Sequence, residues 1–188
     1  MIRVIFLSVL FATWCEARIG DTLEECEARY GEPIEVKEVN ERYRGALSGR
    51  HLFEFDGLNI SAQFDKDGRC VYVTYSNRVE EPRAGLRKLS REQCERLLKL
   101  NGAGQQWTPR EGKSDVRDGE HVKQTTIVEA WERKDGQVLA WYKEMKAAKK
   151  KGRPMIRYSM SVFGCRTADF DALLQELNRK AVPKPGAD

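Results

Sequence analysis

Two histidines, His51 and His121, are the only imidazole groups in the chain. A hydrolase of the Ser–His or Cys–His type needs such a group within hydrogen-bond reach of a nucleophile, together with a third residue that orients it. Neither histidine has a serine, cysteine or aspartate at a spacing that indicates this arrangement. The sequence therefore favours a non-enzymatic protein that needs no cofactor, with a cryptic hydrolase as an alternative.

Glutamates and a cysteine occur together in two similar segments, Thr22–Glu27 and Ser90–Glu95. Such a group suggests acid–base chemistry or a metal site. In each segment, however, Glu25 or Gln93 lies three residues after the threonine or serine that opens it, which is the spacing of a capping box. Carboxylates in a first helical turn also meet the positive end of the helix dipole. No Cys-x-x-Cys zinc spacing is present, so the pattern predicts two capped helices and no metal.

The two segments are 68 residues apart in the sequence. Lys66-Asp67-Gly68 recurs as Lys134-Asp135-Gly136 at the same separation of 68 residues. Two matches in one register predict an internal duplication. The expected fold is α+β: two tandem repeats of an N-terminal helix followed by an antiparallel β-meander, plus a C-terminal helix. The expected boundaries are repeat 1 at 18–77, a linker at 78–89, repeat 2 at 90–165, the C-terminal helix at 166–181 and a disordered tail at 182–188.

Alternating residues predict the strands of both meanders. The first repeat should have an edge strand within 34–43 and strands at 51–55, 58–64 and 69–75. The second should have strands at 121–133, 137–145 and 155–163, after a polar loop at 108–119.

Alternation also assigns side chains to the two faces of each sheet. In the first repeat, an apolar set should lie under the helix, with Cys70 and Tyr72 on the other, more polar face. In the second repeat, the set containing Trp141 should face the helix, and the set containing Trp131 and Tyr142 should lie opposite. A β-bulge at the Lys134-Asp135-Gly136 turn would reverse that assignment. These sets are Phe53, Phe55, Leu58, Ile60, Phe64, Val71, Val73 and Tyr75 in the first repeat, and Val128, Ala130, Leu139 and Trp141 against Ile127, Trp131, Val138 and Tyr142 in the second.

The N-terminus has the pattern of a secretory signal peptide at 1–17: Arg3, an apolar run, and small residues at Cys15 and Ala17. The protein is therefore expected to be exported, as a periplasmic or secreted protein, and not to be transmembrane. Removal of Cys15 with the signal peptide would leave four of the five cysteines, Cys26, Cys70, Cys94 and Cys165, and four cysteines in an exported chain predict two disulfides. Pairing within each repeat, Cys26–Cys70 and Cys94–Cys165, is favoured; the alternative is Cys26–Cys94 with Cys70–Cys165.

One helix signature is similar to that of a known family. Gly20-Asp21-Thr22, Cys26 and Tyr30-Gly31-Glu32-Pro33 resemble the start and end of the helix in BamE/SmpA-like outer-membrane assembly proteins. The tandem layout resembles the secreted β-lactamase-inhibitor-protein-like (BLIP-like) proteins, which carry two helix-plus-meander units. The resemblance covers about 25 residues well and implies a fold that binds other proteins through an open sheet face.

Two groups of residues are candidate contacts. Tyr72, Trp131 and Tyr142 are aromatic residues that would anchor a partner if exposed on the sheet. Between Lys143 and Arg153 lies the densest positive cluster, which would suit an anionic surface such as lipopolysaccharide or membrane headgroups. The members of this cluster chosen as binding residues are Lys146, Lys149, Lys150, Lys151 and Arg153.

The chain carries a net charge of +4 with both signs mixed along it, which does not indicate a nucleic-acid partner. The leading hypothesis is a protein-binding module of the cell envelope or a secreted inhibitor or adaptor. Binding to an anionic surface is the main alternative.

Overall fold

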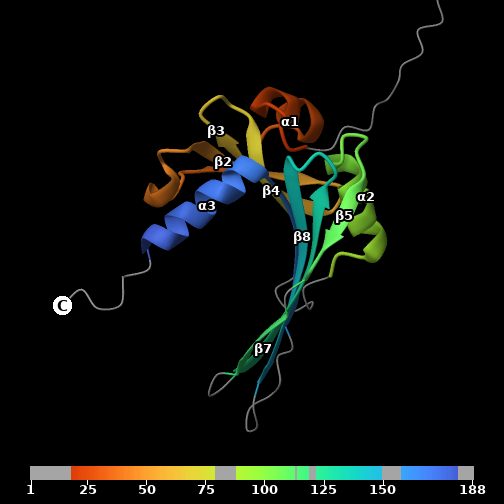
Figure 1. Cartoon of the computed structure of the whole chain (residues 1–188). Coiled ribbons are helices and arrows are strands. Elements are labelled where there is room, and N and C mark those ends of the chain that lie inside the picture. Colours follow the sequence, from red (N-terminus) through yellow and green to blue (C-terminus); the bar gives the residue numbers. More distant parts are fainter. Residues whose placement is uncertain (1–17, 79–87, 113, 119–121, 150–157, 182–188) are drawn as a thin grey trace, which may run out of the picture.

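A computed structural model describes residues 18–78, 88–112, 114–118, 122–149 and 158–181. Within them the protein is α+β, with three α-helices and one antiparallel sheet (Figure 1). The helices are α1 (Leu23–Tyr30), α2 (Arg91–Asn101) and α3 (Ala168–Ala181), with a 3-10 turn, η1, at Glu41–Tyr43. The strands are β1 (Glu35–Lys37), β2 (Leu47–Phe55), β3 (Leu58–Asp65), β4 (Cys70–Asn77), β5 (Trp107–Arg110), β6 (Ser114–Asp118), β7 (Val122–Arg133), β8 (Val138–Lys149) and β9 (Tyr158–Thr167).

The sheet joins two meanders edge to edge. Its strand order is β1-β2-β3-β4-β9-β8-β7-β5, and β6 also pairs with β7. We call α1 to β4 the first half and α2 to α3 the second half. The halves meet where β4 pairs antiparallel with β9, with Val73 opposite Cys165 and Tyr75 opposite Phe163. One sheet therefore runs through both halves.

The segment 108–119, expected to be a polar loop, contributes two short strands instead. β5 and β6 both pair with β7, the long strand of the second meander. An edge strand uses only one of its hydrogen-bonding sides, so it accepts polar residues and even Pro109. The expectation of a loop was wrong because composition alone does not separate such an edge strand from a loop.

The predicted capping boxes are present at both helix starts. Thr22 Oγ1 accepts a hydrogen bond from the Glu25 backbone N–H at 3.2 Å, and a Glu25 carboxylate oxygen accepts one from the Thr22 N–H at 2.8 Å. Ser90 and Gln93 make the same reciprocal pair at 3.1 and 2.8 Å. Glu25 is thus a structural residue, which confirms the interpretation of this segment as a helix start.

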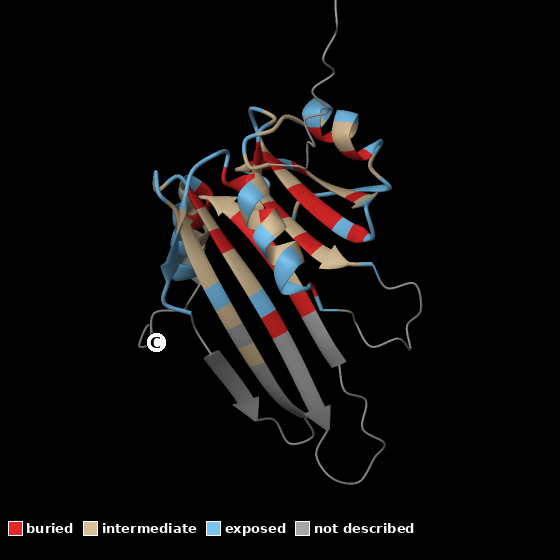
Figure 2. Ribbon diagram, turned by 90° about the vertical axis from the view of Figure 1, so that its right-hand side faces the viewer, coloured by how far each residue is buried: buried red, intermediate tan, exposed pale blue. Residues whose placement is uncertain are grey.

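Helices α1 and α2 lie on one face of the sheet, which we call the inner face, and α3 lies on the opposite, outer face (Figure 1). The inner face carries the core, and Figure 2 shows the buried stretches concentrated where the strands pass the helices. In the first half the expected apolar set is confirmed except at Val71, which is displaced by the bulge described below; Phe55 is 40% exposed, but its ring lies 5.4 Å from that of Tyr30 in α1. Its buried members are Phe53, Leu58, Ile60, Phe64, Val73 and Tyr75.

Cys70 lies on the inner face, contrary to the sequence prediction. A register shift in the β3–β4 pair places Cys70 opposite Phe64 while Tyr72 lies opposite Gln63, so Val71 is an extra residue in β4. This bulge reverses the parity of the strand start. Cys70 is consequently 0% exposed and belongs to the core.

The faces of the second half are the reverse of the prediction. Trp131 pairs with Ala140, Glu129 with Tyr142 and Ala130 with Trp141. The residues predicted to share a face therefore do share one, and only the assignment of each set to the inner or outer face was wrong. Trp131, Tyr142 and Val138, however, pack on the inner face, and Trp141 lies on the outer face near α3. Both sets are apolar because helices cover both faces here, and alternation alone does not say which helix covers which set.

Candidate functional site

The three aromatic residues named as candidate contacts, Tyr72, Trp131 and Tyr142, lie on different faces of the sheet. Trp131 and Tyr142 are partly buried on the inner face. Tyr72 lies on the outer face, where its ring centroid is 5.6 Å from that of Trp141 and 5.9 Å from that of Phe170 in α3. Burial raises the pKa of Tyr72. The three candidates therefore do not form one exposed aromatic surface, and Tyr72 packs α3 on the sheet.

Trp131 and Tyr142 instead line a pocket of about 400 Å³ between α2 and the strands β7 and β8. We call it the α2 pocket. Its lining residues are Leu89, Arg91, Cys94, Glu95, Leu98, Glu129, Trp131, Tyr142 and Glu144.

The elements that form this pocket place its side chains by simple periodicity. Cys94 and Leu98 are four residues apart on α2, so they lie on the same side of the helix. Glu129 and Trp131 are two residues apart on β7, and Tyr142 and Glu144 are two residues apart on β8. Residues two apart on a strand share a face, and all four point to the inner face. The pairing of Glu129 with Tyr142 brings a carboxylate beside an aromatic ring.

Acidic groups outnumber basic ones in this lining, with three glutamates and one arginine. Glu144 is almost buried and its carboxylate lies 2.5 Å from the Lys88 ammonium. Arg91 pairs with Glu95 at 3.0 Å, and both side chains are largely exposed. Within the described part of the chain, no ion pair to Glu129 is present. Its charge contributes, after burial, to raising the pKa of the Cys94 thiol to about 11.

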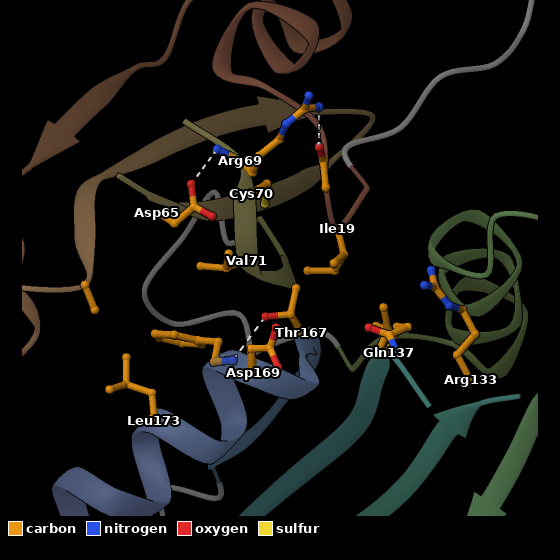
Figure 3. Close-up of a pocket in the computed structure, with 14 residues that line it drawn as sticks. Ile19, Asp65, Arg69, Cys70, Val71, Arg133, Gln137, Thr167, Asp169 and Leu173 are labelled. Atoms are coloured by element: carbon orange, nitrogen blue, oxygen red, sulfur yellow. Dashed lines mark hydrogen bonds between the residues drawn. The ribbon is translucent and has the colours of Figure 1, made fainter. Parts of the chain in front are cut away.

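A second pocket, of about 510 Å³, lies at the junction of the two halves and α3 (Figure 3). Its charged lining is balanced, with Arg69 and Arg133 against Asp65 and Asp169. Arg69 donates a hydrogen bond to the Gly20 carbonyl at 3.1 Å, and Asp65 accepts one from the Arg69 backbone N–H at 2.8 Å. Arg133 pairs with Asp135 at 2.8 Å. Because these groups already stabilise the fold, this larger pocket is the weaker candidate for a ligand.

The four expected disulfide cysteines are free thiols in the structure. Cys26, Cys70 and Cys165 are each 0% exposed in the core, whereas Cys94 lies in the α2 pocket. The expected disulfides Cys26–Cys70 and Cys94–Cys165 are therefore absent from the structure. Burial raises the pKa of Cys26 to about 12 and that of Cys70 and Cys165 well above the ordinary value. Such thiols are poor nucleophiles.

The remaining candidates do not form a site in the described residues. His51 is half-buried on β2, its ring 5.3 Å from that of Phe64, and burial lowers its pKa. Its Nδ1 atom is buried without a hydrogen-bond partner. No group of three or more potential metal ligands occurs among the residues that the structure describes. His121 lies outside those residues.

The lysine cluster also lies largely outside the described residues. Lys150, Lys151 and Arg153 are not described. Lys146 and Lys149 belong to the end of β8, at positions where only the backbone is described. No helix in the described residues is both long and apolar enough to span a membrane.

Comparison with protein-family models, with curated proteins and with solved structures finds no match. Sequence reasoning identified Trp131 and Tyr142 but missed Glu129 and Glu144. The available signal was that Glu129 lies two positions from Trp131 and Glu144 two positions from Tyr142, which puts each glutamate on the same strand face as the aromatic residue.

Proposed function

We propose that this protein is a non-enzymatic binding module whose α2 pocket receives a side chain from a partner protein. The observation that carries the proposal is that Trp131 and Tyr142 both line one partly apolar pocket. Binding pockets are typically lined by apolar and aromatic side chains with a few polar groups, and buried aromatic residues dominate the energetics of many interfaces. The contact surface is then the α2 pocket and not an open sheet face.

The layout of the halves supports the related proposal of a tandem duplication. In each half a helix that starts with a capping box precedes a three-stranded antiparallel meander. The same layout suits the resemblance to BamE/SmpA-like and BLIP-like proteins. Together with the signal-peptide pattern at 1–17, it supports a role as an envelope adaptor or secreted inhibitor.

Site-specific photo-crosslinking in the cells that produce the protein tests the proposal. A photoreactive residue at position 95, on the exposed rim of the pocket, should trap a discrete partner. Position 24 is a matched control, because Glu24 is also an exposed helical glutamate, but on α1.

The crosslink from position 95 should weaken strongly when Trp131→Leu removes the aromatic ring, in a variant first shown to be folded. A crosslink of equal yield from position 24, or one that Trp131→Leu leaves unchanged, would exclude the α2 pocket as the contact. Recovery of no partner from either position would count against the binding function itself.

A further inference from the structure

We infer that the α2 pocket selects an arginine side chain of the partner. The inference rests on the proposed function and adds the chemical class of the inserted group. It is carried by two features of the pocket: the excess of carboxylates and a tryptophan ring over which no cation lies among the described residues.

The carboxylates define the charge of the inserted group. Of the three glutamates in the lining, Glu95 and Glu144 have cationic partners in Arg91 and Lys88. Glu129 has no such partner among the described residues and stands on the same strand face as Trp131, two positions away. An acidic group would be repelled here. A purely apolar group would desolvate carboxylates without replacing their interactions with water.

The outer face of the same sheet shows how an arginine fills such a site. There the Arg166 guanidinium lies over the Trp141 ring, 4.9 Å from its centroid, and also pairs with Asp171 of α3. On the outer face the chain itself therefore supplies all three groups: the indole ring, the guanidinium and the carboxylate. In the α2 pocket the indole of Trp131 and the carboxylate of Glu129 are present, whereas the Arg91 guanidinium pairs with Glu95 and no described cation lies over the Trp131 ring.

Arginine fits this arrangement better than lysine for a physical reason. Its guanidinium is planar, stacks on aromatic rings and donates several hydrogen bonds to carboxylates in a fixed geometry, whereas the lysine ammonium is a compact and strongly hydrated charge. The pocket volume of about 400 Å³ is within the range of specific ligand sites.

Three blocked tripeptides test the inference: acetyl-Gly-Arg-Gly-amide, the same peptide with citrulline, and the same with glutamate. Citrulline keeps the shape of arginine and lacks the charge. Binding is followed through the indole N–H signal of Trp131 in a ¹⁵N-labelled sample, with the Trp141 signal as an internal reference. Only the arginine peptide should saturate the Trp131 shift, with an affinity at least about tenfold above that of citrulline.

Two variants separate charge from general surface effects. Glu129→Gln keeps the side-chain shape and should weaken arginine binding about tenfold, with a smaller dependence on salt. Glu24→Gln removes the same charge from α1 and should change nothing. Equal affinities for arginine and citrulline, or an unchanged affinity in Glu129→Gln, would overturn the inference.

The outcomes also separate the inference from the proposed function. If the position-95 crosslink forms but no peptide shifts Trp131, the protein-binding function stands and arginine selection is rejected. If the arginine peptide binds selectively but no partner crosslinks, arginine selection is supported and the proposed protein partner is not.

Discussion

The indole ring of Trp141 lies over Gly164, its pairing partner on the neighbouring strand. A Cβ atom at position 164 would come within 2.7 Å of Cε2 of the indole. Glycine therefore lets Trp141 approach the backbone while contacting Tyr72 and stacking with Arg166. Tyr72 and Trp141 belong to different halves, so their contact joins the two halves on the outer face.

Gly164→Ala should therefore displace the Trp141 ring and lower the free energy of unfolding by about 1–3 kcal/mol. Urea denaturation measures this change. Gly45→Ala is the matched control, because a Cβ there meets nothing within 4 Å, and it should stay within about 0.5 kcal/mol of the wild type. Equal stabilities for the two variants would show that the indole does not occupy this position.

Removal of either capping side chain should destabilise the protein to a similar extent. Thr22→Ala and Ser90→Ala each delete the acceptor for one backbone N–H at a helix start and should each cost about 1 kcal/mol. Thr22→Ser keeps the hydroxyl and should lose little of this stability. A Thr22→Ser variant as unstable as Thr22→Ala would show that the methyl group matters and the cap does not.

Cys26 makes the fold sensitive to alkali. Burial raises the pKa of its thiol from 9.0 to about 12, so above pH 9 the unfolded chain loses a proton that the folded chain retains. The stability contribution is complete below pH 9 and falls as the pH rises toward 12, by about 1.4 kcal/mol per unit or about 4 kcal/mol in all. The free energy of unfolding of Cys26→Ala, measured between pH 8 and 10.5, should fall less steeply than that of the wild type. Identical slopes would contradict a buried free thiol at this position.

Thiol labelling distinguishes the free cysteines of the structure from the disulfides that the sequence predicts. In the native protein at pH 8, Cys94 should react first because it is only half-buried, while Cys26, Cys70 and Cys165 should react only after unfolding. Mass spectrometry of the labelled, unreduced protein counts the reactive groups. If none of the four reacts after unfolding without a reducing agent, the predicted disulfides form and the thiol description is incorrect.

Local chemistry was readable from the sequence wherever a few neighbouring residues determine it. Thr22 with Glu25, and Ser90 with Gln93, identify helix starts because a capping box needs only residues three apart. The strands and turns of the first half followed in the same way. At the start of the predicted C-terminal helix, Thr167 accepts a hydrogen bond from the Phe170 N–H at 3.2 Å.

Features that depend on tertiary context were not readable. The bulge at Val71 moved Cys70 into the core, and no turn residue marks it. Trp131 and Trp141 belong to two equally apolar sets, so their faces were settled only by the packing of α2 and α3. Because Trp131 and Tyr142 lie on the inner face, they line one pocket with Cys94 and Leu98 of α2. Neither the strand pattern nor the helix pattern alone predicts this pocket.

The most direct test of the central claim, that the α2 pocket is the contact site, uses the tryptophans as reporters. Trp131 lies in the pocket, whereas Trp141 lies on the opposite face under Arg166. The indole N–H signals of ¹⁵N-labelled protein, assigned with Trp→Phe variants, are recorded before and after addition of the crosslinked partner in purified form. A shift or broadening of the Trp131 signal with Trp141 unchanged is the predicted result; a change at Trp141 with Trp131 unaffected would contradict it.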